Sequence, residues 1–263
     1  MSPIRSSLRY VELVRMLAHR EFTGRYRGNL FGASSALVVP VLFLLVYAFV
    51  FTTLIPVEVK PGVRDPGYGF FLFAGLVGWN LFADTTSRAP RLYAQSSSLV
   101  RSSMLPLSAL PVASACASFL TGMLWLAVFV GLRLWRGEAL AAQILLAPVA
   151  LLGLAAVSAG IALALAAIGT LLRDVAELVP PLLGLGFFIS PVLYPASRLA
   201  EHSAWLLTAN PVAGLIETLR ASLLGDGWPS PELLLCAVAW PCAALAFGLL
   251  LHQRVHARLV DRL

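Results

Sequence analysis

Few side chains in this sequence could perform chemistry, and those that could lie at the ends of apolar segments. Charged residues at such ends are Asp84, Arg88, Arg173, Asp174 and Glu177. Acid-base catalysis and proton relays inside a membrane need His or carboxylate groups within the apolar segments. No His lies deep in any of them. The residue types therefore predict a chain with no catalytic residues, which is not an enzyme.

Metal and nucleotide sites are not indicated either. His252 and His256 are four residues apart, but no Cys or carboxylate of a usual zinc motif accompanies them. We therefore expect a solvated basic helix end there, with no metal. A P-loop needs a lysine after glycine and before Ser or Thr, whereas the one lysine, Lys60, precedes Pro61. No cofactor is expected in this chain, and ATP-driven activity would need a second chain that binds ATP and Mg²⁺.

The elements that must position these residues are apolar segments long enough to cross a membrane. A spanning helix needs roughly 20 mostly apolar residues. The composition is 59% hydrophobic and 12% charged, whereas soluble domains have about 25% charged residues. We predict an all-α polytopic membrane protein that forms a single transmembrane domain over residues 1–263. Its six predicted transmembrane helices are 30–55, 69–86, 107–132, 140–172, 178–194 and 233–251.

The distribution of arginines predicts the orientation. Most of the 19 Lys and Arg residues fall on one side if the chain crosses the membrane an even number of times. The positive-inside rule then places both termini in the cytoplasm. The net charge of +6 reflects this bias beside anionic lipid headgroups, so no nucleic-acid partner is expected.

The N-terminal segment, residues 1–28, has the pattern of a basic amphipathic helix. Its apolar side chains share one helical face: Tyr10, Leu13, Val14, Leu17 and Ala18. The polar residues Arg9, Glu12, Arg15, His19 and Arg20 fall elsewhere. A helix of this kind lies in the membrane interface. The alternative is a solvated helix that packs on another protein.

Two connecting segments are long. Residues 87–106 form a predicted cytoplasmic loop with room for a short helix across the helix ends. Residues 195–231 form the outer connection between the fifth and sixth helices. Asn210-Pro211, Glu217 and Arg220 interrupt its apolar character, and each charge in a lipid-exposed helix costs at least ~2.5 kcal/mol. We therefore predict two short re-entrant helices, broken at Pro211, and no further crossing.

Short sequence elements in a particular order carry a resemblance that covers nearly the whole chain. They are Arg25-Tyr26-Arg27, Leu30-Phe31-Gly32 with Pro40, Phe73-Ala74-Gly75 through Trp79-Asn80-Leu81-Phe82, Leu105-Pro106 with Leu110-Pro111, Arg173-Asp174-Val175 before Val179-Pro180, Ser190-Pro191 through Tyr194-Pro195, and Asn210-Pro211 through Glu217 with Arg220. In these elements the chain resembles the transmembrane subunit of type-2 ATP-binding-cassette (ABC) exporters. The similar branch is the one that exports O-antigen, capsular polysaccharide or teichoic acid.

This resemblance implies a function and partners. The chain would be a permease in the bacterial inner membrane that exports a lipid-linked polysaccharide of O-antigen or capsular type. Its implied partners are a second copy of itself, two copies of a separate ATPase subunit, the lipid-linked polysaccharide and membrane lipids. Segment 87–106 would be a coupling helix that seats on the ATPase. The implied coupling residues are Arg88, Arg91, Arg101, Arg173, Asp174 and Glu177. The alternative for the arginines is topology alone.

Aromatic residues are the candidates for the translocation pathway. Sugars present C–H faces that stack on rings, and the family would place several ring-bearing helices around the pore. The candidate rings are Tyr47, Phe51, Phe70, Phe71, Phe73, Trp79, Phe82, Phe187, Phe188 and Tyr194. Ordinary helix packing or an interfacial aromatic belt is the alternative for each. An outer gate is expected at Asn210, Pro211, Glu217 and Arg220, where a local ion pair between the last two is the alternative.

Two other classes of function remain open from the sequence. One is an exporter of drugs or small lipids with the same architecture. The other is a passive channel or membrane enzyme, against which the missing acid-base groups and the ATPase-docking loop count.

Overall fold

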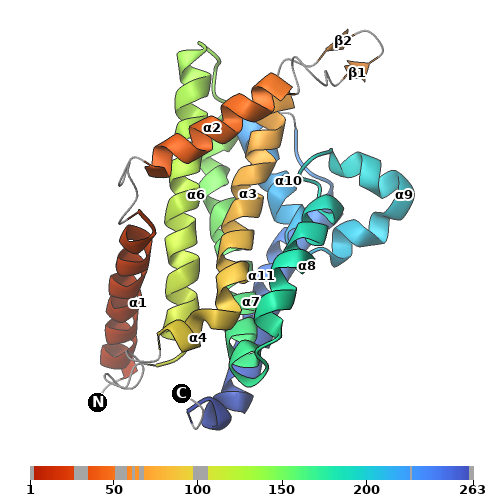
Figure 1. The fold of residues 1–263 in the computed structure, drawn as a ribbon. Coiled ribbons are helices and arrows are strands. Elements are labelled where there is room, and N and C mark those ends of the chain that lie inside the picture. The colour runs from red at the N-terminus through yellow and green to blue at the C-terminus, as the bar shows by residue number, and fades with distance from the viewer. Residues whose placement is uncertain are drawn as a thin grey trace.

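The computed structural model describes residues 3–26, 35–50, 58–60, 63–64, 68–96, 106–225 and 227–260. The described part is almost entirely helical and forms an elongated bundle (Figure 1). Its α-helices are α1 (Pro3–Tyr26), α2 (Ser35–Phe49), α3 (Tyr68–Arg88), α4 (Leu92–Gln95), α6 (Ala109–Trp135), α7 (Ala147–Leu171), α8 (Val175–Ile189), α9 (Ala196–Ala209), α10 (Ala213–Leu224) and α11 (Pro231–Val260). Two 3₁₀ turns, η3 (Ala89–Arg91) and η4 (Ala142–Leu146), and a small antiparallel ribbon, β1 (Glu58–Lys60) with β2 (Val63–Arg64), complete it.

Three helices among the described residues are long and apolar enough to cross a membrane. They are Ala109–Trp135, Ala142–Leu171 and Pro231–Val255, and each coincides with a predicted transmembrane segment. The helices in the other three predicted segments differ in length or polarity. Helices α2 and α8 contain shorter apolar stretches, Val38–Tyr47 and Val175–Ile189, and α3 ends in a polar turn that contains Asp84 and Arg88. The protein is thus a multi-pass membrane protein.

Helix α8 ends earlier than the apolar segment that contains it. The prediction continued this segment to Tyr194, whereas the helix stops at Ile189 and Ser190 adopts an extended backbone with ψ of 147°. Pro191 explains this end, because a proline disfavours the helical conformation in the residue before it. Pro180 and Pro181 lie inside α8, beyond its first turn, so the carbonyls of Ala176 and Glu177 lack their helical N–H partners.

The connection 195–231 contains two helices, as its sequence predicts. Helices α9 and α10 are separated at Asn210, Pro211 and Val212. Helix α9 is itself kinked at Ser203, whose backbone is not helical. Helix α10 lies inside the bundle behind α3, whereas α9 projects from it (Figure 1). The two helices therefore have different surroundings, since α10 is mostly buried and α9 is mostly exposed.

The core of the bundle lies between α3, α6, α7 and α10. Its largest fully buried side chains include Phe73, Phe129, Leu151, Leu154 and Ile216. Helix α11 packs along α7, and a Cβ atom added at Gly160 of α7 would collide with the backbone of Ala244 on α11. Small residues at such a contact let two helices approach closely. This arrangement makes α7 the central helix of the fold.

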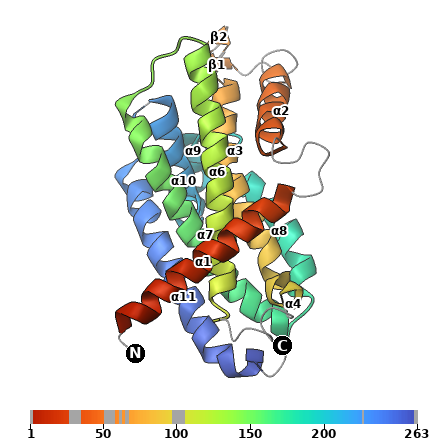
Figure 2. The same cartoon turned by 90° about the vertical axis from the view of Figure 1, so that its left-hand side faces the viewer.

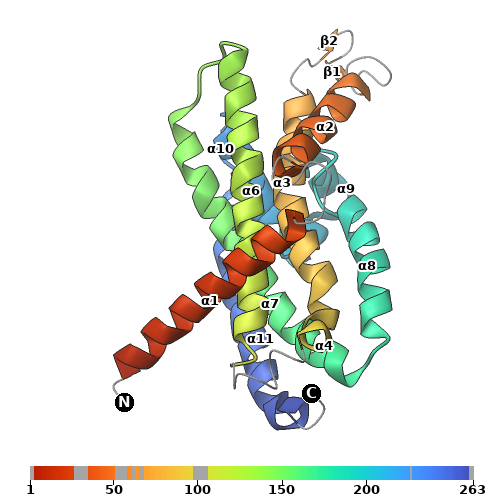
Figure 3. The same ribbon diagram turned by 60° about the vertical axis from the view of Figure 1, so that its left-hand side comes forward.

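The amphipathic helix α1 lies obliquely across the lower half of α6 (Figures 2 and 3). Val14, Leu17 and Ala18 are buried, and Tyr10 and Leu13 pack against the same cluster. The polar residues of the sequence pattern are exposed. The predicted apolar face is confirmed, and its packing partners are helices of this same chain.

One end of the bundle gathers both chain ends and the short connections. The N- and C-termini, α4 and the turn between α7 and α8 lie toward this end, whereas the β1–β2 ribbon lies at the opposite end (Figure 1). Helix α3 therefore leads from the ribbon end directly into η3 and α4. We call the end that carries α4 and both termini the α4 end.

Candidate functional site

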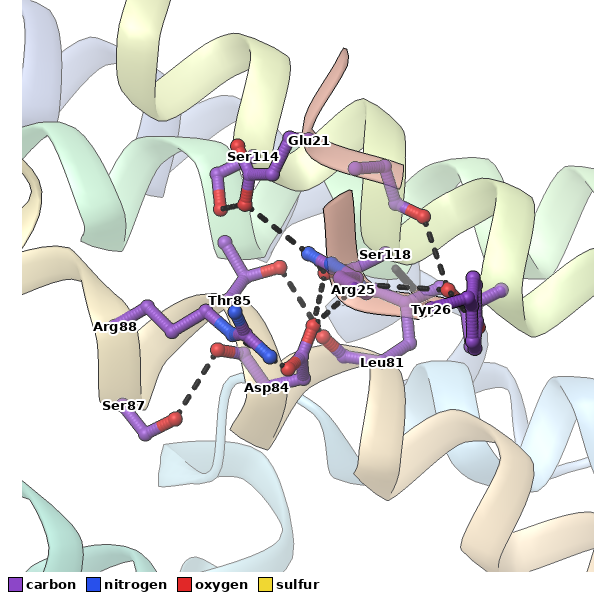
Figure 4. A network of polar contacts seen from close by, with 12 residues as sticks. Glu21, Arg25, Tyr26, Leu81, Asp84, Thr85, Ser87, Arg88, Ser114 and Ser118 are labelled. Carbon is purple, nitrogen blue, oxygen red and sulfur yellow. Dashed lines mark hydrogen bonds and ion pairs between the residues drawn. The ribbon is translucent and has the colours of Figure 1, made fainter. Parts of the chain in front are cut away.

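A network of charged and hydroxyl side chains joins α1, α3 and α6 near the α4 end (Figure 4). Arg25 of α1 is its centre. Its Nη1 lies 2.7 Å from Asp84 Oδ2 of α3, and its Nη2 lies 3.2 Å from Glu21 Oε1. Asp84 also accepts a bond of 2.8 Å from Arg88 Nε through its other oxygen. The Arg25 side chain is 8% exposed, so its charge is neutralised inside the protein, as a buried guanidinium requires.

Hydroxyl groups of α6 complete the network. Ser118 Oγ donates to Asp84 Oδ2 at 2.7 Å, and Ser114 Oγ donates to Glu21 Oε1 at the same distance. Arg25 donates to Ser118 at 3.1 Å and to Thr121 at 3.4 Å. Helical spacing places these three α6 residues on the side that faces α1. The end of α1 is therefore tied to both long helices by charged hydrogen bonds.

A cleft of about 280 Å³ opens beside this network. Arg25 and Tyr26 form one wall, Asn80 and Asp84 another, and Thr121 with Trp125 a third. Asp84 is 31% exposed and Arg88 is 47% exposed, so they mark the open side of the cleft. From the sequence, Asp84 is predicted only as a charge at the end of an apolar segment and Arg88 as a coupling residue, and Arg25 is not among the predicted site residues. The sequence element Arg25-Tyr26-Arg27, which contributes to the family resemblance, could have indicated Arg25 as a site residue.

The predicted coupling residues lie at the α4 end, and those that the structure describes are exposed. Arg88 precedes η3 and Arg91 ends it, Arg173 and Asp174 lie in the turn between α7 and α8, and Glu177 lies in the first turn of α8. Arg101 lies outside the described residues. A Cβ atom added at Gly169 of α7 would collide with the carbonyl oxygen of Pro90. The 3₁₀ turn η3 is therefore seated directly on α7.

A second contact anchors α4. Tyr93 is fully buried, and its hydroxyl lies 3.3 Å from Nδ1 of His252 on α11. Burial raises the pKa of Tyr93, with a smaller contribution from Tyr10, so the hydroxyl stays protonated at neutral pH. His252 is only 6% exposed. The expectation of a solvated histidine at this helix end is thus wrong for His252, because α4 folds over it.

The predicted pathway aromatics fall into separate groups. Phe70 and Phe73 face α6, where Phe73 stacks on Trp125 and Phe129 with ring centroids 5.6 and 6.1 Å apart. The rings of Phe70 and Phe129 are nearly perpendicular, with their centroids 5.4 Å apart. These rings belong to the packing between α3 and α6.

Tyr47 extends the same packing from α2. It stacks on Phe43, whose ring lies 5.9 Å from Trp125. Phe51 lies outside the described residues.

A second group of rings follows the contact between α3 and α8. The ring centroid of Trp79 lies 5.6 Å from those of both Phe82 and Phe187, and the centroids of Phe187 and Phe188 are 5.5 Å apart. Trp79 and Phe82 also line an apolar groove of about 390 Å³ between α3, α7, α8 and α9. Tyr194 donates its hydroxyl to the Phe188 carbonyl at 2.6 Å, which fixes the turn after α8. These rings, unlike Phe70 and Phe73, adjoin open space.

Two of the predicted outer-gate residues, Glu217 and Arg220, lie on α10, and Arg220 is buried there. Arg220 is paired with Glu217 and is 5% exposed. Its Nη2 donates to the carbonyls of Pro191 and Val192 at 2.8 and 3.1 Å, and its guanidinium lies 3.7 Å from the ring centroid of Phe71. The ion pair that the sequence allowed is therefore present, and Arg220 also binds the turn after α8.

Gly75 and Asn210 also contact this region around α10. A Cβ atom at Gly75 of α3 would lie 2.7 Å from Arg220 Nη2 and 3.0 Å from the Val192 carbonyl oxygen. Glycine is thus needed for α3 to pass so close to Arg220. Asn210 accepts a bond of 3.0 Å from the Val212 amide and donates to Ser190 at 2.8 Å. Its side chain therefore starts α10 and links it to the end of α8.

Comparison with known proteins agrees with this architecture. The family described as ABC-2 type transporter matches residues 12–224. The O-antigen export system permease protein RfbA of Myxococcus xanthus is 28% identical over 238 residues, which cover 90% of this chain and 89% of that protein. Two Klebsiella pneumoniae proteins of the same name are 23% and 22% identical over 210 residues, or 80% of this chain and 79% of each relative. With the family match running from α1 to α10, this chain belongs to the ABC-2 type transporter family.

Proposed function

We propose that this chain is the membrane-spanning subunit of an ATP-driven exporter that moves a lipid-linked polysaccharide of O-antigen type across the bacterial inner membrane. One observation carries the proposal. The similarity to permeases named for O-antigen export extends over 90% of this chain and 89% of the Myxococcus xanthus relative. It is not confined to a short motif, so it includes the helices that would surround the substrate.

ATP hydrolysis in this proposal belongs to a separate partner chain, which binds ATP and Mg²⁺. The docking surface is the α4 end, with both termini in the cytoplasm. Two observations support this surface. Arg91 and the Arg173–Glu177 turn are exposed there, and η3 and α4 are fixed to α7 and α11 through Pro90 and Tyr93. A push on α4 would therefore move long helices as rigid bodies.

The functional unit in this proposal contains two copies of the chain and two ATPase subunits. Helices α2 and α8 leave large apolar side chains exposed, including Phe43, Phe49, Leu182 and Phe188. Such faces suit contact with lipid or with a second copy. The conduit would then lie between the copies, where α8 brings Phe187 and Phe188 next to Trp79.

Deletion of the chain in its host tests the function. We expect loss of long surface polysaccharide on gels and in antibody staining, accumulation of lipid-linked polysaccharide on the cytoplasmic face of the inner membrane, and recovery with a plasmid copy. A deletion strain with normal surface polysaccharide and a new sensitivity to drugs would instead indicate the drug-exporter class. The control is deletion of the gene for the proposed ATPase partner, which must reproduce the phenotype.

A further inference from the structure

A groove of about 170 Å³ lies between α1, α4 and α6 at the α4 end. Helices α1 and α4 both pack against α6 (Figure 3), and the groove is formed where they do so. Its polar side chains come from three elements: Arg20 of α1, Arg88 at the end of α3, and Gln95 and Ser96 at the end of α4. Arg20, Arg88 and Gln95 are exposed, so a ligand can reach them.

The charges around this groove do not cancel within the described part of the chain. Arg25 and Arg88 are paired with Asp84 and Glu21 in the neighbouring network. Arg20 adds a third guanidinium and forms no ion pair with a described residue. Three cations therefore accompany two carboxylates, and one positive charge is in excess. An anion that enters the groove would neutralise it.

Hydrogen-bond donors at the groove are also unused. Arg88 bonds Asp84 through Nε alone, so its two terminal nitrogens have no partner among the described residues. Glu21, the one carboxylate among the lining residues, already accepts bonds from Ser114 and Arg25 through Oε1. A phosphate group presents oxygens that accept bonds from several directions, whereas a carboxylate has two oxygens in one plane. Donors that come from three elements therefore fit a phosphate better than a carboxylate side chain.

The rest of the groove is apolar. Leu17, Leu92 and Leu110 line it. Met16, which is 60% exposed, lies four residues before Arg20 and so shares its side of α1. In a phospholipid the phosphate is joined directly to the hydrocarbon part, and basic amphipathic helices are attracted to anionic lipids. A phosphate-binding rim beside apolar side chains, in a chain that crosses the membrane, thus matches a phospholipid rather than a soluble phosphate.

We propose that this groove binds the phosphate of an anionic phospholipid headgroup. Arg20 and the terminal nitrogens of Arg88 donate to the phosphate oxygens, Gln95 and Ser96 add further donors, and the glycerol and first acyl carbons lie against Leu17. The bound lipid would tie α1 to α4, next to the proposed docking surface. This lipid site does not depend on what the protein exports.

Photolabelling tests the site directly. The full chain is placed in nanodiscs of phosphatidylcholine with a small fraction of phosphatidylglycerol that carries a diazirine at the start of one acyl chain. After irradiation, labelled peptides are identified by mass spectrometry. We expect label in the peptides that contain Leu17, Leu92 or Leu110. Excess unlabelled phosphatidylglycerol should compete, whereas inorganic phosphate should not, because it makes no contact with the apolar side chains.

A matched pair of substitutions separates the groove from general surface charge. Arg20→Gln removes a charge that lines the groove, and Arg15→Gln removes an exposed charge of the same helix that does not line it. We expect Arg20→Gln to reduce labelling of the groove by at least about ten-fold, as the loss of a charged hydrogen bond does. Arg15→Gln should leave it unchanged. Arg20→Lys should retain most of the labelling, because lysine also binds phosphate. Thermal unfolding midpoints close to that of the unaltered chain show that the variants are folded.

Four results would overturn the lipid site. They are label confined to other parts of the chain, equal effects of Arg20→Gln and Arg15→Gln, an equal loss in Arg20→Lys and Arg20→Gln, and displacement by inorganic phosphate as effective as that by phosphatidylglycerol. Loss of label on addition of the purified ATPase partner, without competition by phosphatidylglycerol, would assign the groove to an acidic segment of that protein instead.

Discussion

Arg25 and Asp84 form an ion pair of 2.7 Å that joins the end of α1 to the end of α3. Replacing Asp84 by Asn leaves the buried guanidinium with Glu21 as its remaining carboxylate partner. We expect the stability to fall by about 1–3 kcal/mol, because a charged hydrogen bond to a mostly buried group is lost. The measurement is the thermal unfolding midpoint of the purified protein.

Arg88→Gln is the matched control for this prediction. It removes the other partner of Asp84, but the Arg88 side chain is 47% exposed, and exposed ion pairs contribute at most about 1 kcal/mol. Equal losses of stability in Asp84→Asn and Arg88→Gln would show that the contribution of the Arg25–Asp84 ion pair to stability does not depend on the burial of Arg25.

The contact between Tyr93 and His252 predicts a second effect. Tyr93→Phe removes a buried hydroxyl whose partner lies on α11 and should lower stability by about 1 kcal/mol. It should also weaken the stimulation of the ATPase, since α4 would be held less firmly. Tyr10→Phe is the control, because the Tyr10 hydroxyl makes a longer bond of 3.4 Å to Ser108. The idea fails if stimulation survives Tyr93→Phe unchanged.

Much of this architecture could be predicted from local sequence pattern. The apolar face of α1 and the break at Asn210-Pro211 follow from helical periodicity and from the conformational limits of proline. The end of α8 at Ile189 also follows from a proline, because Pro191 disfavours a helical backbone at Ser190. The sequence prediction missed this end because the apolar residues continue to Tyr194.

Contacts between distant residues could not be predicted in this way. Arg25 meets Asp84, and Tyr93 meets His252, only because α1 and α4 fold against other helices. The aromatic residues illustrate the same limit. Phe70 and Phe73 point to α6 while Trp79 faces α8, and composition alone does not distinguish these environments.

Gly75 provides a prediction about the outer cluster. A methyl group in Gly75→Ala would displace Arg220 from the carbonyls of the turn after α8, so both export and thermal stability should decrease. Gly131→Ala on α6 is the control, because an added Cβ atom there meets nothing within 4 Å. Normal export and stability in Gly75→Ala would show that the Arg220 contacts are dispensable.

Coupling and conduction can be separated by two sets of substitutions. Joint replacement of Arg88, Arg91 and Arg101 by Ala should weaken binding and stimulation of the ATPase. Trp79→Ala, Phe82→Ala or Tyr194→Ala should leave binding intact and slow export, since a lost stacking contact weakens interaction by roughly 1–3 kcal/mol, by analogy with bases on aromatic rings.

The control for the arginine set is joint replacement of Arg9, Arg15 and Arg20, which removes the same charge from the exposed face of α1. If this control weakens ATPase binding equally in pull-down experiments, the effect is one of total charge. Aromatic variants that export at the normal rate would instead leave those rings with a packing role.

The topology of α9 and α10 can be tested by labelling. In a variant without Cys116, Cys236 and Cys242, single cysteines at the exposed positions Ser197 and Ser230 should both react with an impermeant maleimide from outside. Reaction of only one of them from that side would mean that this region crosses the membrane.

Reconstituted transport tests the central claim most directly. Inverted vesicles that contain the chain and its ATPase are supplied with ATP, Mg²⁺ and radiolabelled lipid-linked O-antigen, and the label protected inside the vesicles is measured. We predict ATP-dependent accumulation that requires both chains and is lost when the ATPase cannot hydrolyse ATP. Vesicles with a fully active ATPase that accumulate no polysaccharide, or that accumulate it equally without ATP, would contradict the account.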